Sequence, residues 1–280
     1  MLFVGGGLVT PRLAARTAAR RWHKLPGNKG RRQDNRAQSG QVETLDTGLP
    51  ERLVVESWGS GDRLVYLVHG WGGWRGQVAA FVQPLVEAGF RVIAADTAAH
   101  GDSEPGRYGS DHSSGGEMIE GIENVIHHFG QPHAVIAHSL GCANICRAIL
   151  DGEVRAERLV LVAPNPDMEF QANKYGRSLG FRSSTIKRMI DYMELWAKWK
   201  MSDFDVATMA QTGRLPPALI IHDRADKETP YDTAEQMAAA WPTARLMTTS
   251  GLGHHRILIS KPVIEAATRF VVTGEYAQAQ

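Results

Sequence analysis

Short runs of Val, Ile and Leu alternate with helix-patterned segments over most of this 280-residue chain. Such runs are typical of strands buried on both faces, and the segments between them are typical of helical crossovers. The expected strands span residues 64–68, 91–95, 134–137, 159–162, 218–222 and 245–249. The expected helices span residues 77–88, 116–129, 142–150, 233–241 and 262–272. This order predicts an α/β fold: a mostly parallel central sheet with helices on both faces.

One segment, residues 165–213, is far longer than a crossover between two strands needs. It is helix-prone and rich in large apolar side chains, among them Phe181, Met189, Met193 and Trp199. We expect a helical cap inserted over the mouth of the sheet. The alternative is a packing subdomain whose apolar residues only face the core, and both can hold because a cap must pack as well as cover.

The first 50 residues lack this alternation. Residues 1–36 hold nine Lys and Arg and one acidic residue, whereas the rest of the chain holds 22 basic and 29 acidic residues. We therefore expect a basic N-terminal extension and linker over residues 1–50, with the linker at 26–50, and a folded domain over residues 51–280. The mildly acidic body gives no reason to expect nucleic-acid binding.

The extension carries Arg12, Arg16 and Arg20 at a spacing of four residues. It is either solvated chain or a short basic amphipathic helix that makes weak contact with an anionic membrane surface. No apolar run approaches the roughly 18 residues of a membrane span, and the apolar start precedes the arginines, which reverses the order of a secretory signal. Only two cysteines occur, one helical turn apart, which excludes a disulfide framework. We expect a cytoplasmic protein.

Residues 135–141 read Val-Ile-Ala-His-Ser-Leu-Gly, an apolar strand that runs through a serine into a helix. A sharp strand-to-helix turn of this kind presents a serine hydroxyl above a sheet. It requires small neighbours, since strand and helix nearly collide there, and Ala137 and Gly141 are small. We predict that Ser139 is a nucleophile. The alternative is that it only caps the helix.

The strand at residues 64–68 ends in His69-Gly70-Trp71-Gly72-Gly73. Glycine lets the backbone approach a bound group closely. We predict an oxyanion hole made of two backbone N–H groups, one from Trp71 in this loop and one from Leu140 after the serine. The alternative is an ordinary strand-ending turn.

Two later strands are followed by residues that complete this pattern. Asp223 and Asp226 follow the strand at 218–222, and His254 follows the strand at 245–249. In open α/β sheets the site lies at the carboxyl ends of the strands. The chain order of serine, acid and histidine is also the order that a nucleophile-elbow sheet requires.

Together these residues resemble the α/β-hydrolase superfamily over about residues 53–272. Residues 96–103 are similar to the family's Asp-x-Pro-Gly-His-Gly-x-Ser loop, with Ala98 and Ala99 in place of its Pro and Gly. The nearest branch is that of capped esterases and lysophospholipase-like enzymes. The dehalogenase and epoxide-hydrolase branches are excluded, because their nucleophile is Asp and this chain has Ser139.

The resemblance implies an α/β-hydrolase fold and a serine hydrolase that cleaves a carboxylic ester through Ser139, His254 and Asp226. Asp223 and Asp167 are alternative acids. The candidate pocket residues are His69, His138, Met189, Met193, Trp196 and Trp199. The same triad would serve a thioesterase, a lactonase or a C–C bond hydrolase. The alternative from another class is a non-catalytic binding protein of the same fold.

Nothing in the sequence indicates a cofactor or a metal. The pairs His127-His128 and His254-His255 are adjacent, and neighbouring residues rarely point both rings at one ion. No phosphate loop and no placed dinucleotide fingerprint occurs. We expect a small, apolar ester or acyl substrate. No motif lies in residues 1–36, so we expect their removal to leave activity on soluble esters unchanged.

Overall fold

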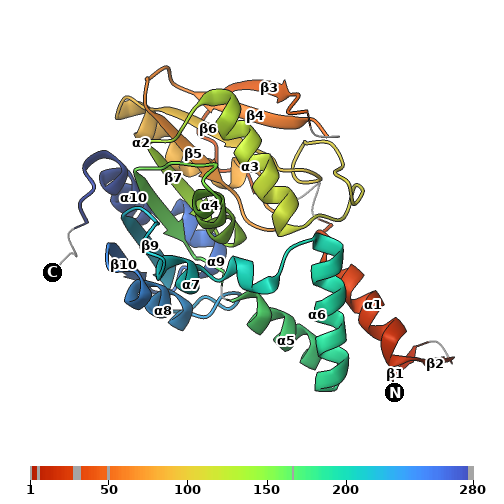
Figure 1. The fold of residues 1–280 in the computed structure, drawn as a ribbon. Helices are drawn as coiled ribbons and strands as arrows, with labels where there is room; N and C mark the ends of the chain where they lie inside the picture. Colours follow the sequence, from red (N-terminus) through yellow and green to blue (C-terminus); the bar gives the residue numbers. More distant parts are fainter. Residues whose placement is uncertain (1, 5–6, 28–32, 49–50, 166, 277–280) are drawn as a thin grey trace.

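An eight-stranded sheet forms the centre of the molecule (Figure 1). The computed structural model describes residues 2–4, 7–27, 33–48, 51–165 and 167–276. The strand order is β10-β9-β8-β7-β5-β6-β4-β3, with parallel pairing from β10 to β6 and antiparallel pairing of β4 with β6 and β3. The strands are β3 (Gln41–Leu45), β4 (Leu53–Trp58), β5 (Leu64–Val68), β6 (Arg91–Ala95), β7 (Ala134–His138), β8 (Arg158–Val162), β9 (Ala218–Asp223) and β10 (Ala244–Thr249). The predicted mostly parallel sheet is confirmed.

All six expected strands are present, and their ends differ from the expected ones by one residue at most. The sequence pattern did not indicate the two antiparallel strands. β3 is a largely exposed edge strand with polar residues, and β4 is interrupted by the buried Glu56. The linker expected over residues 26–50 therefore contains the outermost strand, and the sheet begins before the expected domain boundary at residue 51.

Helices cover both faces of the sheet (Figure 1). Successive side chains of β5 point to opposite faces of the sheet and so show the two layers. Tyr66 and Val68 belong to one apolar cluster, and Val65 and Leu67 belong to the other. The first cluster includes α3 (Gly115–Phe129), α4 (Leu140–Asp151) and α8 (Asp232–Ala240). The second includes α2 (Val82–Glu87) and α10 (Lys261–Thr273).

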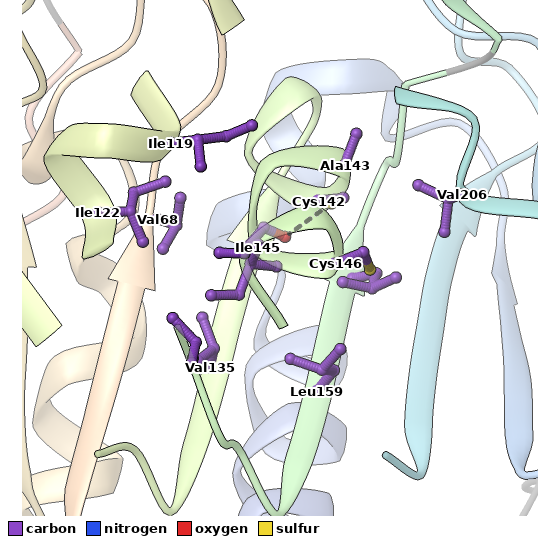
Figure 2. Packing of buried hydrophobic residues seen from close by; sticks show 14 of the residues in the cluster. Val68, Ile119, Ile122, Val135, Cys142, Ala143, Ile145, Cys146, Leu159 and Val206 are labelled. Atoms are coloured by element: carbon purple, nitrogen blue, oxygen red, sulfur yellow. Dashed lines mark hydrogen bonds between the residues drawn. The ribbon is translucent and has the colours of Figure 1, made fainter. Parts of the chain in front are cut away.

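Helix α4 is fixed against the middle of the sheet. Figure 2 shows Cys142, Ile145 and Cys146 on this helix, packed with Val135 of β7 and Leu159 of β8. The Cys142 thiol also donates a hydrogen bond to the carbonyl of Ala137, 3.3 Å away. Both cysteines are free and fully buried. The start of α4, which immediately follows Ser139, is therefore held in place.

The cap is built from α5 (Met168–Ser178) and α6 (Ser183–Ala197), after which the 3₁₀ helix η3 (Met201–Phe204) and α7 (Val206–Ala210) lead back to the sheet. A further helix, α1 (Pro11–Trp22), lies along α6 (Figure 1). A short antiparallel pair, β1 (Leu2–Val4) and β2 (Gly7–Val9), precedes α1. None of the described helices is long and apolar enough to span a bilayer.

The sequence of α1 accounts for its start and for its partner. Thr10 caps the helix, since its hydroxyl accepts the Leu13 N–H at 3.3 Å, and Pro11 occupies the first turn. Its buried face consists of the small residues Ala15, Ala18 and Ala19, which pack with Met189 and Met193 of α6. The extension was expected to be either solvated chain or a short helix. Residues 11–22 form a helix, and this helix contacts the cap.

Candidate active site

Ser139 occupies a strained turn between β7 and α4. Its backbone has φ 52° and ψ −125°, a conformation that costs a non-glycine residue about 1–3 kcal/mol. The turn is crowded, because a Cβ at Gly70 would lie 2.7 Å from the Ser139 Cβ and a Cβ at Gly141 would lie 2.6 Å from the His69 carbonyl oxygen. Glycine is therefore required at both positions, as the sequence indicated for Gly141.

His254 lies in the short helix α9 (Gly253–Arg256), and Asp226 lies in the loop after β9. Their side chains meet, with 2.7 Å between His254 Nδ1 and Asp226 Oδ2. The same carboxylate accepts hydrogen bonds from the backbone N–H groups of Glu228 (2.8 Å) and Thr229 (2.9 Å) and from the Thr229 hydroxyl (2.9 Å). Both oxygens of Asp226 are thus fixed by donors.

This environment keeps Asp226 charged. Burial opposes ionisation, but hydrogen bonds from His222, His254 and the Thr229 N–H outweigh it and hold the pKa of Asp226 well below its usual range. A charged acceptor at Nδ1 favours the tautomer in which His254 carries its proton on Nδ1. Nε2, which lies 3.9 Å from the Glu228 carboxylate, is then the ring nitrogen that can accept a proton.

The two alternative acids make their hydrogen bonds elsewhere. The Asp223 carboxylate accepts from the Thr249 hydroxyl at 2.7 Å and from the Leu252 N–H at 3.0 Å. It therefore braces the loop that leads to His254. Asp167 caps α5 and accepts the Glu169 N–H at 2.8 Å.

The two expected oxyanion donors lie beside the serine. Leu140 is the first residue of α4, and Trp71 follows Gly70, which packs directly against Ser139. Both residues line the same cavity as Ser139 and His254. The two residues expected to supply the oxyanion hole thus come from different elements and share one cavity wall with the serine.

A buried ion network, which the sequence pattern did not indicate, supports the Trp71 loop. The Arg75 guanidinium pairs with Glu56 (3.0 Å), with Asp102 (3.0 Å) and with Asp96, and the Arg75 N–H donates to Asp96 at 2.7 Å. The side chains of Glu56 and Asp96 are fully buried. The network connects β4, the loop after β5 and the loop after β6. Asp96 stands in the family-like motif, but no signal marked Glu56 or Arg75.

Ser139 and His254 line one cavity of about 360 Å³. Much of its wall is apolar, contributed by Trp22, Trp71, Met168, Trp199, Met201 and Phe204. Polar side chains on the wall include those of Gln171, Lys200 and Glu228. Among the described residues, no group of three or more His, Cys, Asp or Glu side chains is placed to hold a metal ion.

Of the expected pocket residues from the cap, the structure brings Trp199 to this cavity. Met189 and Met193 are fully buried where α6 packs against α1. Trp196 stacks on Tyr108, with ring centroids 3.8 Å apart, and contacts the tilted ring of His23, with centroids 4.2 Å apart. The spacing of apolar residues along α6 indicated an apolar face, but it could not indicate that α1 covers that face.

The two expected pocket histidines hold loops instead. The Nε2 atom of His69 accepts the Thr97 N–H at 3.2 Å and so links the loops after β5 and β6. His138 is fully buried, and burial together with the neighbouring His254 lowers its pKa well below the usual value. Its Nε2 lies 3.0 Å from the His254 carbonyl oxygen, to which the neutral ring donates.

Comparisons with known families match the chain twice. Residues 63–184 match a family described as alpha/beta hydrolase fold, and residues 187–280 match one described as TAP-like protein. Together with the sheet topology, these matches show that the chain belongs to the α/β-hydrolase superfamily. A comparison with curated proteins found no match.

Solved structures show the same fold. Est1E from Butyrivibrio proteoclasticus, solved with ferulic acid bound, is 19% identical over 82% of this chain and 96% of its own, with a TM-score of 0.63. A putative lipase from Acinetobacter baumannii is 17% identical over 97% and 100%, with a TM-score of 0.64. A monoacylglycerol lipase from Paleococcus ferrophilus is 24% identical over 80% and 99%, with a TM-score of 0.60.

Replacing the buried arginine should destabilise the protein strongly. Arg75→Met leaves the buried carboxylate of Asp96 without its arginine, whereas Glu56 keeps Arg36 at 2.9 Å. The unpaired charge of Asp96 costs about 3–5 kcal/mol in the free energy of unfolding. The control is Arg52→Met, whose partner Glu104 is 40% exposed, so the expected loss is much smaller than that of Arg75→Met. Urea unfolding measures both. Equal losses would show that the network does not hold these loops.

Proposed function

We propose that this protein is a serine hydrolase that cleaves a carboxylic ester by acyl transfer. One observation carries the proposal: Ser139, on its strained turn, and His254, held by Asp226 at 2.7 Å, line the same cavity. In this proposal Ser139 is the nucleophile, His254 is the base and Asp226 is the residue that orients the base.

The reaction follows from these positions. His254 Nε2 takes the hydroxyl proton of Ser139 as the serine oxygen attacks the ester carbonyl, and the Leu140 and Trp71 N–H groups donate to the oxyanion. The proton then passes to the leaving alcohol, and an acyl-enzyme remains. Water, deprotonated by His254, releases the acid. Asp226 stabilises the imidazolium formed in each step.

An apolar substrate suits the cavity. Its volume of about 360 Å³ falls in the usual range of roughly 300–1,000 Å³ for small-molecule sites, and its aromatic and Met side chains favour apolar groups. Two structural neighbours, Est1E with ferulic acid bound and a monoacylglycerol lipase, support this class of substrate.

Thioesters, lactones and 1,3-diketones fit the same chemistry. A panel of p-nitrophenyl esters, acyl thioesters and lactones separates the three hydrolytic activities. A non-catalytic binding protein of this fold would turn over none of them.

Removing the serine hydroxyl should abolish hydrolysis. We expect Ser139→Ala to lower kcat for p-nitrophenyl butyrate by about 10⁴-fold or more, because no other group can form the acyl-enzyme. Circular dichroism and thermal unfolding serve as the control for folding. Near-normal turnover by a folded Ser139→Ala protein would refute the assignment of the nucleophile.

Three Asn variants decide which acid orients the histidine. Asp226→Asn should lower kcat by about 10³–10⁴-fold, because an amide favours the wrong His254 tautomer. Asp223→Asn should act mainly on stability, with a loss of about 1–3 kcal/mol from its buried hydrogen bonds, and Asp167→Asn should change little. If Asp223→Asn or Asp167→Asn is inactive while Asp226→Asn works normally, the assignment is wrong.

The N-terminal helix supplies a weak membrane contact in this proposal. Arg12, Arg16 and Arg20 are exposed on α1, and Leu13 beside them is 55% exposed. Near an anionic surface each such cation contributes about 1 kcal/mol. The protein should therefore bind anionic vesicles weakly and in a salt-dependent way.

Co-sedimentation with vesicles that contain phosphatidylserine tests this contact. At low salt we expect a bound fraction that falls as salt rises, and a marked loss of binding in a triple variant with Gln at the three positions. Vesicles of phosphatidylcholine alone are the control. Equal binding by the triple variant and the unaltered protein would contradict a contact through α1.

A further inference from the structure

The N-terminal segment reaches the cavity of the candidate active site. Trp22, the last residue of α1, and the following His23 line the cavity that also contains Ser139 and His254. Trp22 is half-buried, and His23 is 4% exposed. The wall of the cavity is therefore built from residues more than 100 positions apart in the chain.

Backbone hydrogen bonds fix this segment to the loop before α3. The His23 carbonyl accepts the Ser113 N–H at 3.1 Å, and the Leu25 N–H donates to the Asp111 carbonyl at 2.8 Å. Lys24 lies between them and forms an exposed ion pair with Asp111, at 3.3 Å. Residues 23–25 are thus paired with the loop in the manner of a short strand.

Side-chain contacts fix the same segment to the cap. The His23 ring contacts the Trp196 ring, as described above, and the Trp22 ring lies 5.3 Å from that of Tyr175, centroid to centroid. Trp22 also packs in the cap cluster that contains Met201, a residue of the cavity wall. Trp22 and His23 therefore each contact an aromatic ring of the cap.

The cap depends on α1 for its own packing. Met189 and Met193 are fully buried, and Ala15, Ala18 and Ala19 of α1 belong to the same apolar cluster. Without α1, one face of α6 would be open to water. The cap is therefore made from two separate stretches of chain, α1 and the insertion after β8.

The chemistry of the segment suits an apolar wall. Burial lowers the pKa of His23 to about 4, so its ring is uncharged at neutral pH. Trp22 offers a large, rigid surface at a small entropic cost, because its side chain has only two rotatable bonds.

We infer that Trp22 is a specificity-determining residue, whose indole, backed by His23, closes the cavity on the cap side and limits the length of the acyl chain that it accepts. The inference rests on the proposed ester hydrolysis. It replaces the expectation that removal of residues 1–36 leaves activity unchanged, because two residues of that segment belong to the cavity wall.

The test is the chain-length profile of Trp22→Ala on p-nitrophenyl esters from acetate to laurate. Removing the indole opens space for several methylenes, each worth about 0.8 kcal/mol or roughly fourfold in kcat/KM. We expect the ratio of kcat/KM for laurate to that for butyrate to rise about tenfold or more. Trp22→Phe should give an intermediate ratio. The matched control is Thr17→Ala, an exposed position on the same helix, which should keep the profile of the unaltered protein.

A second readout needs no substrate. Met201 is 6% exposed and contacts the wall, whereas Met209 is 4% exposed and lies outside the cavity. In hydroxyl-radical footprinting, Met201 of the Trp22→Ala variant should be oxidised several-fold faster than Met201 of the unaltered protein. Met209 should be oxidised at the same rate in both proteins. An unchanged rate at Met201 would overturn the placement of the wall.

The two readouts separate the possible failures. Faster oxidation of Met201 with an unaltered chain-length profile would overturn the role of Trp22 in specificity. If the unaltered protein hydrolyses no ester in the series, the proposed function fails and the specificity role fails with it. Footprinting would then still decide whether Trp22 closes the cavity.

Discussion

The turn at Ser139 is the constraint on which the rest of the site depends. Its left-handed backbone costs about 1–3 kcal/mol, and it persists because both flanking elements are anchored. β7 is paired with β5 on one side and β8 on the other, and α4 is buried through Cys142 and Ile145. In return, the turn places the serine at the carboxyl edge of the sheet, with the first N–H group of α4 beside it.

The loops around the serine are held by buried polar groups, each paired with another. Arg75 connects three carboxylates behind the Trp71 loop, Asp223 binds the backbone that leads to His254, and His138 donates to the His254 carbonyl. Unpaired, these groups would cost several kcal/mol each. The polar network thus fixes the positions of loops that the strands alone would leave free.

Local sequence patterns were sufficient to predict the six parallel strands and to place Ser139, Asp226 and His254 each after one of them. In the structure Ser139 and His254 line one cavity, and Asp226 contacts His254. The patterns did not indicate β4, whose apolar run contains the charged Glu56, nor the edge strand β3. They also could not indicate that α1 covers Met189, since that contact joins segments about 170 residues apart. Long-range partners of an apolar face leave no local signal, so Trp22 and His23 were missed as cavity residues.

The central claim, that Ser139 is an activated nucleophile, is tested most directly with a fluorophosphonate, which reacts covalently with the serine of an active serine hydrolase. Intact-protein mass spectrometry should show the addition of one phosphonyl group, and peptide mapping should place it on Ser139. Ser139→Ala should remain unlabelled, and Asp226→Asn should react much more slowly. A folded, unaltered protein that gains no mass, or that is labelled at another residue, would contradict the account.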